Sequence, residues 1–142
     1  MLYIGQESKQ RMFENATNTY PDECCGFLYG TEDSTGDRTV TDIVVVQNGK
    51  DGDKRKRFEI TPKDYLNAEQ YALDHDLQLL GVYHSHPDHP PVPSEQDRIA
   101  AQPYFSYLII SVIEGRPELV RSWRLNDEAK FDEELISEKP IA

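Results

Sequence analysis

Two histidines and an aspartate in the second half of the chain have the types and the spacing of a metal site. His84 and His86 lie two positions apart in an apolar segment, and side chains at that spacing project from the same face of a β-strand. Their imidazole nitrogens can then bind one ion at about 2.0–2.1 Å. Asp97, in the segment after the Pro-rich loop, can place its carboxylate next to the same ion. Two histidines and one carboxylate leave a fourth position for water, which is the arrangement of catalytic rather than structural zinc.

Each of these residues also has an ordinary structural explanation. A strand histidine is most often a packed or solvent-facing side chain. Ser94 and Asp97 fit a helix capping box, with the serine as N-cap and the acid three residues later. The two explanations of Asp97 are compatible, because a capped helix start fixes the direction of a ligand. The combination therefore favours a metal site.

The surrounding segments predict alternating strands and helices. The predicted helices span 6–17, 62–75 behind the N-cap Thr61, and Ser94 to about 101. The predicted strands span 24–30, 39–47, 58–60, 79–86, 106–113 and 118–125, with a last short strand near Phe131. This order predicts an α/β fold with a single mixed central β-sheet flanked by helices.

Composition limits the class of protein. The 142 residues suit a single domain, 1–142, and we expect an acidic C-terminal tail to fray from about residue 136. Acidic residues outnumber basic ones 26 to 15, and the formal net charge of −11 argues against a nucleic-acid partner. The apolar segments are too short to span a bilayer and no signal peptide is visible, so the expected location is cytoplasmic, without a membrane partner.

The segment His84-Ser85-His86-Pro87, followed by Ser94 and Asp97, resembles the motif of the JAMM, or MPN-domain, zinc metalloproteases and isopeptidases. That family adds a glutamate near the start of its first strand, and Glu23 before Cys24-Cys25-Gly26 matches it, as in the short prokaryotic branch. The resemblance implies the MPN, cytidine-deaminase-like architecture. It also implies one zinc ion per chain, held by His84, His86 and Asp97.

The same resemblance assigns two catalytic residues. It implies that Glu23 deprotonates the attacking water and later passes the proton to the leaving amine. Ser94 would hydrogen-bond the oxyanion of the tetrahedral intermediate. General chemistry agrees, because zinc lowers the pKa of a bound water to about 7 and a hydroxyl donor stabilises an oxyanion.

The short segment after the motif makes ubiquitin a doubtful substrate, and the class of substrate comes from the resemblance. The eukaryotic deubiquitinases of the family carry long insertions that grip ubiquitin, whereas a short segment separates Asp97 from the strand predicted to begin at Ser106. The short prokaryotic relatives act on small ubiquitin-like sulfur-carrier proteins. The resemblance therefore implies hydrolysis of a peptide or isopeptide bond after the Gly-Gly tail of such a partner, which can add as a strand to an exposed sheet edge.

Two alternatives stay open. A non-catalytic MPN scaffold would only bind partner proteins, although such members typically lack one or more ligands and all five motif positions are filled here. A cysteine-dependent hydrolase would use Cys24 or Cys25 with His84, although adjacent cysteines in an apolar segment offer poor exposure. A zinc deaminase is excluded, because its Pro-Cys-x-x-Cys ligand segment is missing. The oligomeric state stays unknown.

Overall fold

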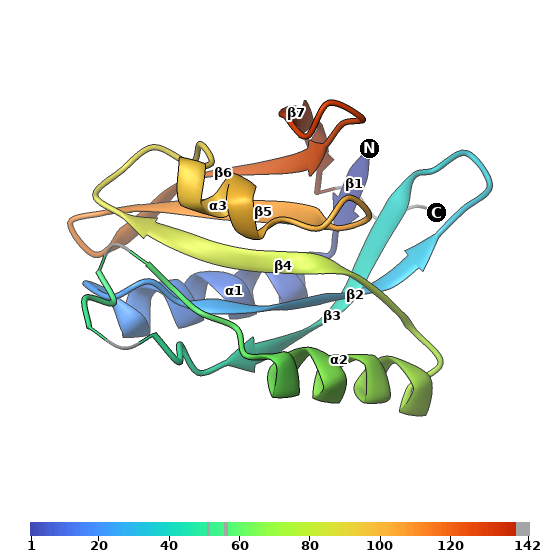
Figure 1. Cartoon of the computed structure of the whole chain (residues 1–142), viewed down its shortest axis with the longest axis horizontal. Helices are drawn as coiled ribbons and strands as arrows, with labels where there is room; N and C mark the ends of the chain where they lie inside the picture. Colours follow the sequence, from blue (N-terminus) through green and yellow to red (C-terminus); the bar gives the residue numbers. More distant parts are fainter. Residues whose placement is uncertain (51, 56, 139–142) are drawn as a thin grey trace.

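The computed structural model describes residues 1–50, 52–55 and 57–138 (Figure 1). The elements follow in the order β1 (Leu2–Ile4), α1 (Gln6–Thr19), β2 (Cys25–Glu32), β3 (Arg38–Val46), α2 (Pro62–Asp74), β4 (Gln78–Pro87), α3 (Glu95–Ala100), β5 (Ser106–Ile113), β6 (Arg116–Leu125), β7 (Phe131–Glu134) and β8 (Ile136–Ser137). An 8-stranded sheet has the order β7-β6-β5-β4-β2-β3-β1-β8. The predicted α/β fold with a mixed sheet flanked by helices is confirmed.

Strand β4 lies in the middle of this sheet and carries both motif histidines. It runs antiparallel to β2 on one side and parallel to β5 on the other. Parallel neighbours need a crossover connection, and the segment between β4 and β5 contains α3, which carries Asp97. The crossover therefore brings the start of α3 back over the end of β4.

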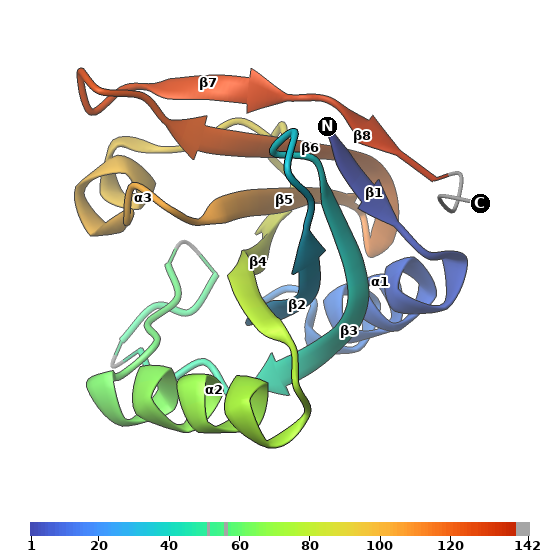
Figure 2. The ribbon, with the colours of Figure 1, turned by 90° about the vertical axis from the view of Figure 1, so that its right-hand side faces the viewer.

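Helices α1 and α2 cover opposite faces of the sheet (Figure 2). Met12 and Ala16 of α1 belong to one apolar cluster with Tyr83 of β4, whereas Ala68 of α2 belongs to a second cluster with Val82. Successive strand residues point to opposite faces, so from Val82 onward, past the irregularity near Leu80, the even-numbered residues of β4 face the side of α2. Both motif histidines are even-numbered and lie on that side.

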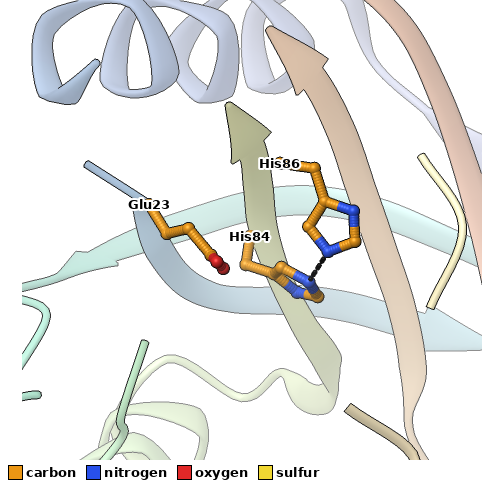
Figure 3. A group of neighbouring side chains, drawn as sticks. All are labelled: Glu23, His84 and His86. Atoms are coloured by element: carbon orange, nitrogen blue, oxygen red, sulfur yellow. Dashed lines mark hydrogen bonds between the residues drawn. The ribbon is translucent and has the colours of Figure 1, made fainter. Parts of the chain in front are cut away.

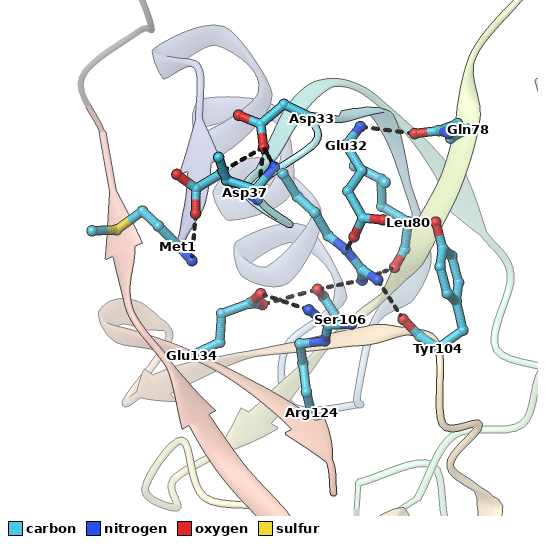
Figure 4. Close-up of polar contacts among 12 residues, drawn as sticks. Met1, Glu32, Asp33, Asp37, Gln78, Leu80, Tyr104, Ser106, Arg124 and Glu134 are labelled. Atoms are coloured by element: carbon cyan, nitrogen blue, oxygen red, sulfur yellow. Dashed lines mark hydrogen bonds and ion pairs between the residues drawn. The ribbon is translucent and has the colours of Figure 1, made fainter.

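A buried arginine ties several strands together, and Figure 4 labels its partners Glu32, Leu80, Tyr104 and Ser106. Arg38 of β3 is 0% exposed, and its guanidinium donates to Glu32 at 2.7 Å and to Ser106 Oγ at 2.9 Å. It also donates to the main-chain carbonyls of Leu80, at 3.1 Å, and Tyr104, at 2.7 Å. These bonds join β2, β3, β4 and the start of β5, and they fix the segment that leads from α3 into β5.

Three details differ from the sequence-based expectation. Segment 58–60 was predicted as a strand, but it has no partner strand and runs as an extended loop, because a side chain takes the amide of Glu59. Strands β1 and β8 were not predicted; they are short and pair with each other in parallel. The tail expected from about residue 136 begins as β8, and residues 139–142 lie outside the described part of the chain.

Replacing the buried arginine tests this account of the fold. We expect Arg38→Met to lower the free energy of unfolding by about 3 kcal/mol or more, because it leaves Glu32 and two carbonyls without their donor. Arg11→Met is the matched control, since Arg11 pairs with Asp42 at 2.9 Å on the surface and such pairs contribute at most about 1 kcal/mol. Urea unfolding measures both, and equal losses would contradict the proposed role of Arg38.

Candidate active site and metal centre

Three side-chain atoms from β4 and α3 meet at one point. The Nε2 atoms of His84 and His86 lie 3.1 Å apart. The Oδ2 atom of Asp97 lies 3.4 Å from Nε2 of His84 and 3.3 Å from Nε2 of His86. The residues that the sequence put forward as ligands are therefore brought together, although they come from a strand and a helix.

This triangle of atoms fits a tetrahedral metal ion. Two ligands of a tetrahedral ion at about 2.0–2.1 Å lie about 3.3–3.4 Å apart, which is close to all three separations between the side chains. The donor set of two imidazoles and one carboxylate is also one that zinc accepts. The geometry of the described residues is thus suited to such an ion, while the assignment of the ligands stays a prediction.

The two imidazoles are oriented by different contacts. Nδ1 of His86 lies 2.9 Å from the main-chain oxygen of Pro90, so an N–H at Nδ1 leaves the lone pair on Nε2 available to a metal ion. His84 is 1% exposed, and its ring stacks on Phe58 with ring centroids 4.5 Å apart. Its Nδ1 atom has no hydrogen-bond partner among the residues that the structure describes. Packing against Phe58 thus orients the His84 ring.

Glu23 reaches the same point from the start of β2. Antiparallel pairing sets Cys25 opposite His84, and the amide of Ser85 donates to the carbonyl of Cys24 at 3.2 Å. One more step along both strands puts Glu23 beside His86, and its carboxylate points toward the imidazoles (Figure 3). The ligand atoms of Glu23, His84 and His86 all lie within 4.8 Å of one another. Glu23 and Asp97 are therefore two candidate carboxylates at one histidine pair.

The environment gives the two carboxylates opposite character. Glu23 is 4% exposed, and burial, assisted by the negative charge of Asp97 and opposed by His86, raises its pKa to about 8. Burial also acts against the charge of Asp97, but both imidazoles and the amide of Ser94 outweigh it and hold the pKa of Asp97 well below its usual value. Asp97 is therefore a permanent anion suited to a ligand, while Glu23 can hold a proton near neutral pH.

The pKa values of the two histidines are also shifted in opposite directions. Burial lowers the pKa of His84, although Asp97 acts in the other direction. Burial also disfavours the charge on His86, but its contacts with Asp97 and with the carbonyl of Pro90 outweigh this, and the pKa of His86 is raised. His84 is thus held neutral, which is the state that binds a metal ion.

Ser94 and Asp97 form the capping box that the sequence indicated. The amide of Asp97 donates to Ser94 Oγ at 3.1 Å, and the amide of Ser94 donates to Asp97 Oδ2 at 2.8 Å. Because Ser94 Oγ accepts in this pair, its own hydroxyl proton remains available to another acceptor. The cap therefore fixes both the candidate ligand Asp97 and a free hydroxyl donor.

Two surface hollows meet at Ser94. One hollow contains His84, Asp97 and the extended segment 58–60, and its rim carries Lys50 and Arg57. The other hollow is lined by the residues Glu23, Arg55, His86, Pro87, His89, Pro90, Val92 and Ser94. A substrate chain that crosses Ser94 would therefore pass over the histidine pair with a hollow on each side.

Sequence reasoning missed two residues that shape these hollows. The side chain of Asn48, 8% exposed, binds the main chain of Glu23 and of the loop that follows. The indole N–H of Trp123 donates to the carbonyl of Pro91 at 3.0 Å and holds the Pro-rich loop against β6. Asparagine before glycine predicts only a turn, and a tryptophan in a strand predicts packing, so neither long-range contact has a local sequence signal.

Comparison with known proteins gives one family and several relatives. Residues 5–126 match the model of the prokaryotic homologues of the JAB domain. A desampylase of Haloferax volcanii is 36% identical over 99 residues, which cover 69% of this chain and 68% of that protein. A CysO-cysteine peptidase of Mycobacterium tuberculosis is 27% identical over 142 residues, which cover 99% of this chain and 90% of that protein.

Solved structures are similar over almost the whole chain. A protein of Desulfitobacterium hafniense has a TM-score of 0.83 and 29% identity, over 98% of this chain and 94% of that chain. A protein of Salinibacter ruber has a TM-score of 0.74 and 37% identity, over 98% of this chain and 92% of that chain.

Within the described residues, each helix is too short or too polar to cross a membrane.

Metal analysis tests which carboxylate completes the site. We expect about one zinc ion per chain after purification without a histidine tag, and we expect His86→Ala and Asp97→Ala to lose most of it, because each removes one vertex of the triangle. Glu23→Gln should keep the metal, and His75→Ala, at the end of α2, is the control for removing a surface imidazole. If Asp97→Ala keeps its zinc and Glu23→Gln loses it, Glu23 is the metal ligand and Asp97 is not.

Proposed function

The chain belongs to the family of prokaryotic homologues of the JAB domain, and from this membership we propose that it is a zinc-dependent hydrolase of peptide or isopeptide bonds. Its substrate would be a small ubiquitin-like or sulfur-carrier protein, cleaved after a Gly-Gly tail. The observation that carries the proposal is the meeting of His84, His86 and Asp97 within 3.1–3.4 Å, with Glu23 beside them. The family and the hydrolase class predicted from the sequence are confirmed by the family match and by the desampylase and CysO-cysteine peptidase relatives.

In the proposed reaction, His84, His86 and Asp97 would hold a zinc ion. The ion would supply a Lewis acid for the scissile carbonyl and for the attacking water. The raised pKa of Glu23, about 8, supports its assignment as the general base and acid, because catalytic groups work best when their pKa lies near the working pH. The Glu23 carboxylate takes the proton of the attacking water and returns it to the nitrogen of the leaving amine.

Ser94 would stabilise the charge that develops on the substrate carbonyl. Its Oγ accepts the amide of Asp97, so its hydroxyl proton can be donated to the oxyanion. The capping box limits the movement of the side chain, so the donor needs little reorganisation during the reaction. Its position at the junction of both hollows supports this assignment.

The two hollows suggest a direction for the substrate. Glu23 lines the hollow that contains Pro87 and Pro90, and a group that protonates the leaving amine must lie on the leaving side. The tail before the scissile bond would then occupy the other hollow, along segment 58–60. Small residues suit the junction, because side chains next to the reacting carbonyl would crowd the loop 87–93.

The main-chain groups that could pair with the tail belong to segment 58–60 and not to an edge strand of the sheet. The edge strands are β7 and β8, and neither lines the hollows. In segment 58–60, the amide and the carbonyl of Glu59 bind Asn48 and Gly49, so Phe58 and Ile60 turn their main-chain groups the other way. Within the described residues these groups have no hydrogen-bond partner, and an extended tail could pair with them.

The cysteine-dependent alternative is disfavoured by the environment of both thiols. Cys24 and Cys25 are 3% and 0% exposed. Burial raises the pKa of the Cys24 thiol to about 11 and that of the Cys25 thiol to about 12, whereas a nucleophilic cysteine needs a lowered pKa. The non-catalytic scaffold is disfavoured by a different fact, since the donor atoms are assembled at metal-binding distances.

The roles of Glu23 and Ser94 can be tested by kinetics. We expect Glu23→Gln to lower kcat by about two to four orders of magnitude, the usual range for a lost general acid or base. Ser94→Ala should lower it by about two to three orders, as for a missing oxyanion donor. Both variants should keep zinc, with His75→Ala close to wild type. Normal turnover in Glu23→Gln would remove Glu23 from the mechanism.

Substrate recognition can be tested with a matched pair of fusions. One joins a small ubiquitin-like protein with a native Gly-Gly tail to a C-terminal extension, and the other has Val-Val in place of Gly-Gly. We expect cleavage of the first alone, blocked by a zinc chelator and unaffected by thiol alkylation. Equal cleavage of both would reject tail recognition, and inhibition by alkylation without inhibition by the chelator would support the cysteine alternative.

A further inference from the structure

The side chain of Asn48 uses its full hydrogen-bonding capacity at one buried point beside the site. Its Nδ2 group donates to the carbonyls of Glu23, at 3.1 Å, and Arg57, at 3.0 Å. Its Oδ1 atom accepts from the amides of Lys50, at 2.9 Å, and Glu59, at 3.1 Å. Two carbonyls on one side and two amides on the other allow a single orientation of the carboxamide, so no other residue type reproduces the set.

These bonds replace a strand partner for Glu23. Glu23 lies before the start of β2, outside the ladder that holds the sheet. Its amide donates to the carbonyl of Lys54 at 2.7 Å, and its carbonyl accepts from Asn48. Both main-chain groups of Glu23 are therefore bound by the loop between β3 and α2, with Asn48 at the base of that loop.

The Asn48 carboxamide also fixes the position of segment 58–60, which lies on the opposite side of the site from Glu23. By binding the amide of Glu59, together with the bond from the Gly49 amide to the Glu59 carbonyl at 3.1 Å, it turns Phe58 and Ile60 toward the hollow. The ring of Phe58 in turn stacks on His84. A single buried side chain therefore sets the distance between Glu23 and the segment proposed to hold the substrate tail.

We propose that Asn48 is a positioning residue that couples the acid/base Glu23 to the tail-binding segment 58–60, without contacting the substrate itself. This inference rests on the proposed function. Alignment of reacting groups is sensitive to small displacements, and a shift of about 1 Å can cost about a hundredfold in rate. Loss of Asn48 should therefore reduce turnover through Glu23 and weaken tail binding through segment 58–60.

A double-mutant cycle in the full chain tests this coupling, with zinc content and thermal unfolding measured for each variant. We expect Asn48→Ala to lower kcat about a hundredfold, to raise KM severalfold and to keep zinc. In the Glu23→Gln background, measured by single turnover with excess enzyme, the same change should cost less than about threefold in rate, because the group that Asn48 positions is already lost. The effect on KM should persist there.

Asn126→Ala is the matched control. Asn126 closes the turn between β6 and β7 by accepting the amides of Glu128, at 2.9 Å, and Lys130, at 3.1 Å, away from both hollows. It should lower thermal stability while leaving kcat and KM near wild type. A drop in kcat equal to that of Asn48→Ala would identify a general stability effect and overturn the proposal.

Asn48→Asp separates the two halves of the contact. It keeps the acceptor for Lys50 and Glu59 and removes the donors to Glu23 and Arg57, so we expect kcat to fall with a smaller change in KM than in Asn48→Ala. If the loss of kcat in the double variant equals the product of the losses in the two single variants, the two residues act independently. That result would overturn the inference and would not contradict the proposed function. Full activity of Glu23→Gln alone would reject both, and unfolding of both Asn48 variants would make Asn48 structural and reject the positioning role.

Discussion

The site depends on one carboxylate oxygen that serves two structures at once. Oδ2 of Asp97 accepts the amide of Ser94, which begins α3, and the same atom faces Nε2 of His84 and of His86 at 3.4 and 3.3 Å. The capping box and the triangle of atoms therefore share this oxygen, so the start of α3 and the direction of the Asp97 carboxylate are coupled. A change that moves the start of α3 would move the candidate ligand Asp97 and the hydroxyl of Ser94 together. The short crossover between β4 and β5 restricts such movement from both ends.

The donors of the triangle and Glu23, the proposed acid/base, are held by different contacts. The two histidines sit in the ladder of a central strand that has neighbours on both sides and apolar clusters on both faces. The network of Arg38 fixes the chain where it enters β5, so the crossover is anchored behind α3. Glu23 lies outside the ladder and is held by a loop and by Asn48. Both arrangements hold the side chains in place, the histidines through the sheet and Glu23 through a loop and one buried side chain.

The sequence predicted what local spacing and chemistry determine. The spacing of His84 and His86, the cap at Ser94 and the long apolar strands are local features, and Glu23 followed from the resemblance alone. The sequence missed features that exist only through distant contacts. Strands β1 and β8 form by pairing with each other and with β3, so their two or three residues carry no pattern of their own. Segment 58–60 has the composition of a strand, but the capture of the Glu59 amide by Asn48 keeps it out of the sheet.

The end of the ladder between β2 and β4 also determines which side chains lie beside the two histidines. Cys25 is paired with His84 in the ladder, and the carbonyl of Cys24, just before β2, accepts the amide of Ser85. Burial opposes thiolate formation at both cysteines and leaves them as small apolar residues. Glu23 lies one residue before Cys24, and its side chain lines the hollow that contains His86. A shift of this register by one residue would exchange the faces of all three side chains and would carry the carboxylate away from the histidines. The register of β2 against β4 thus favours metal-assisted over thiol chemistry, although both kinds of group lie next to each other in the sequence.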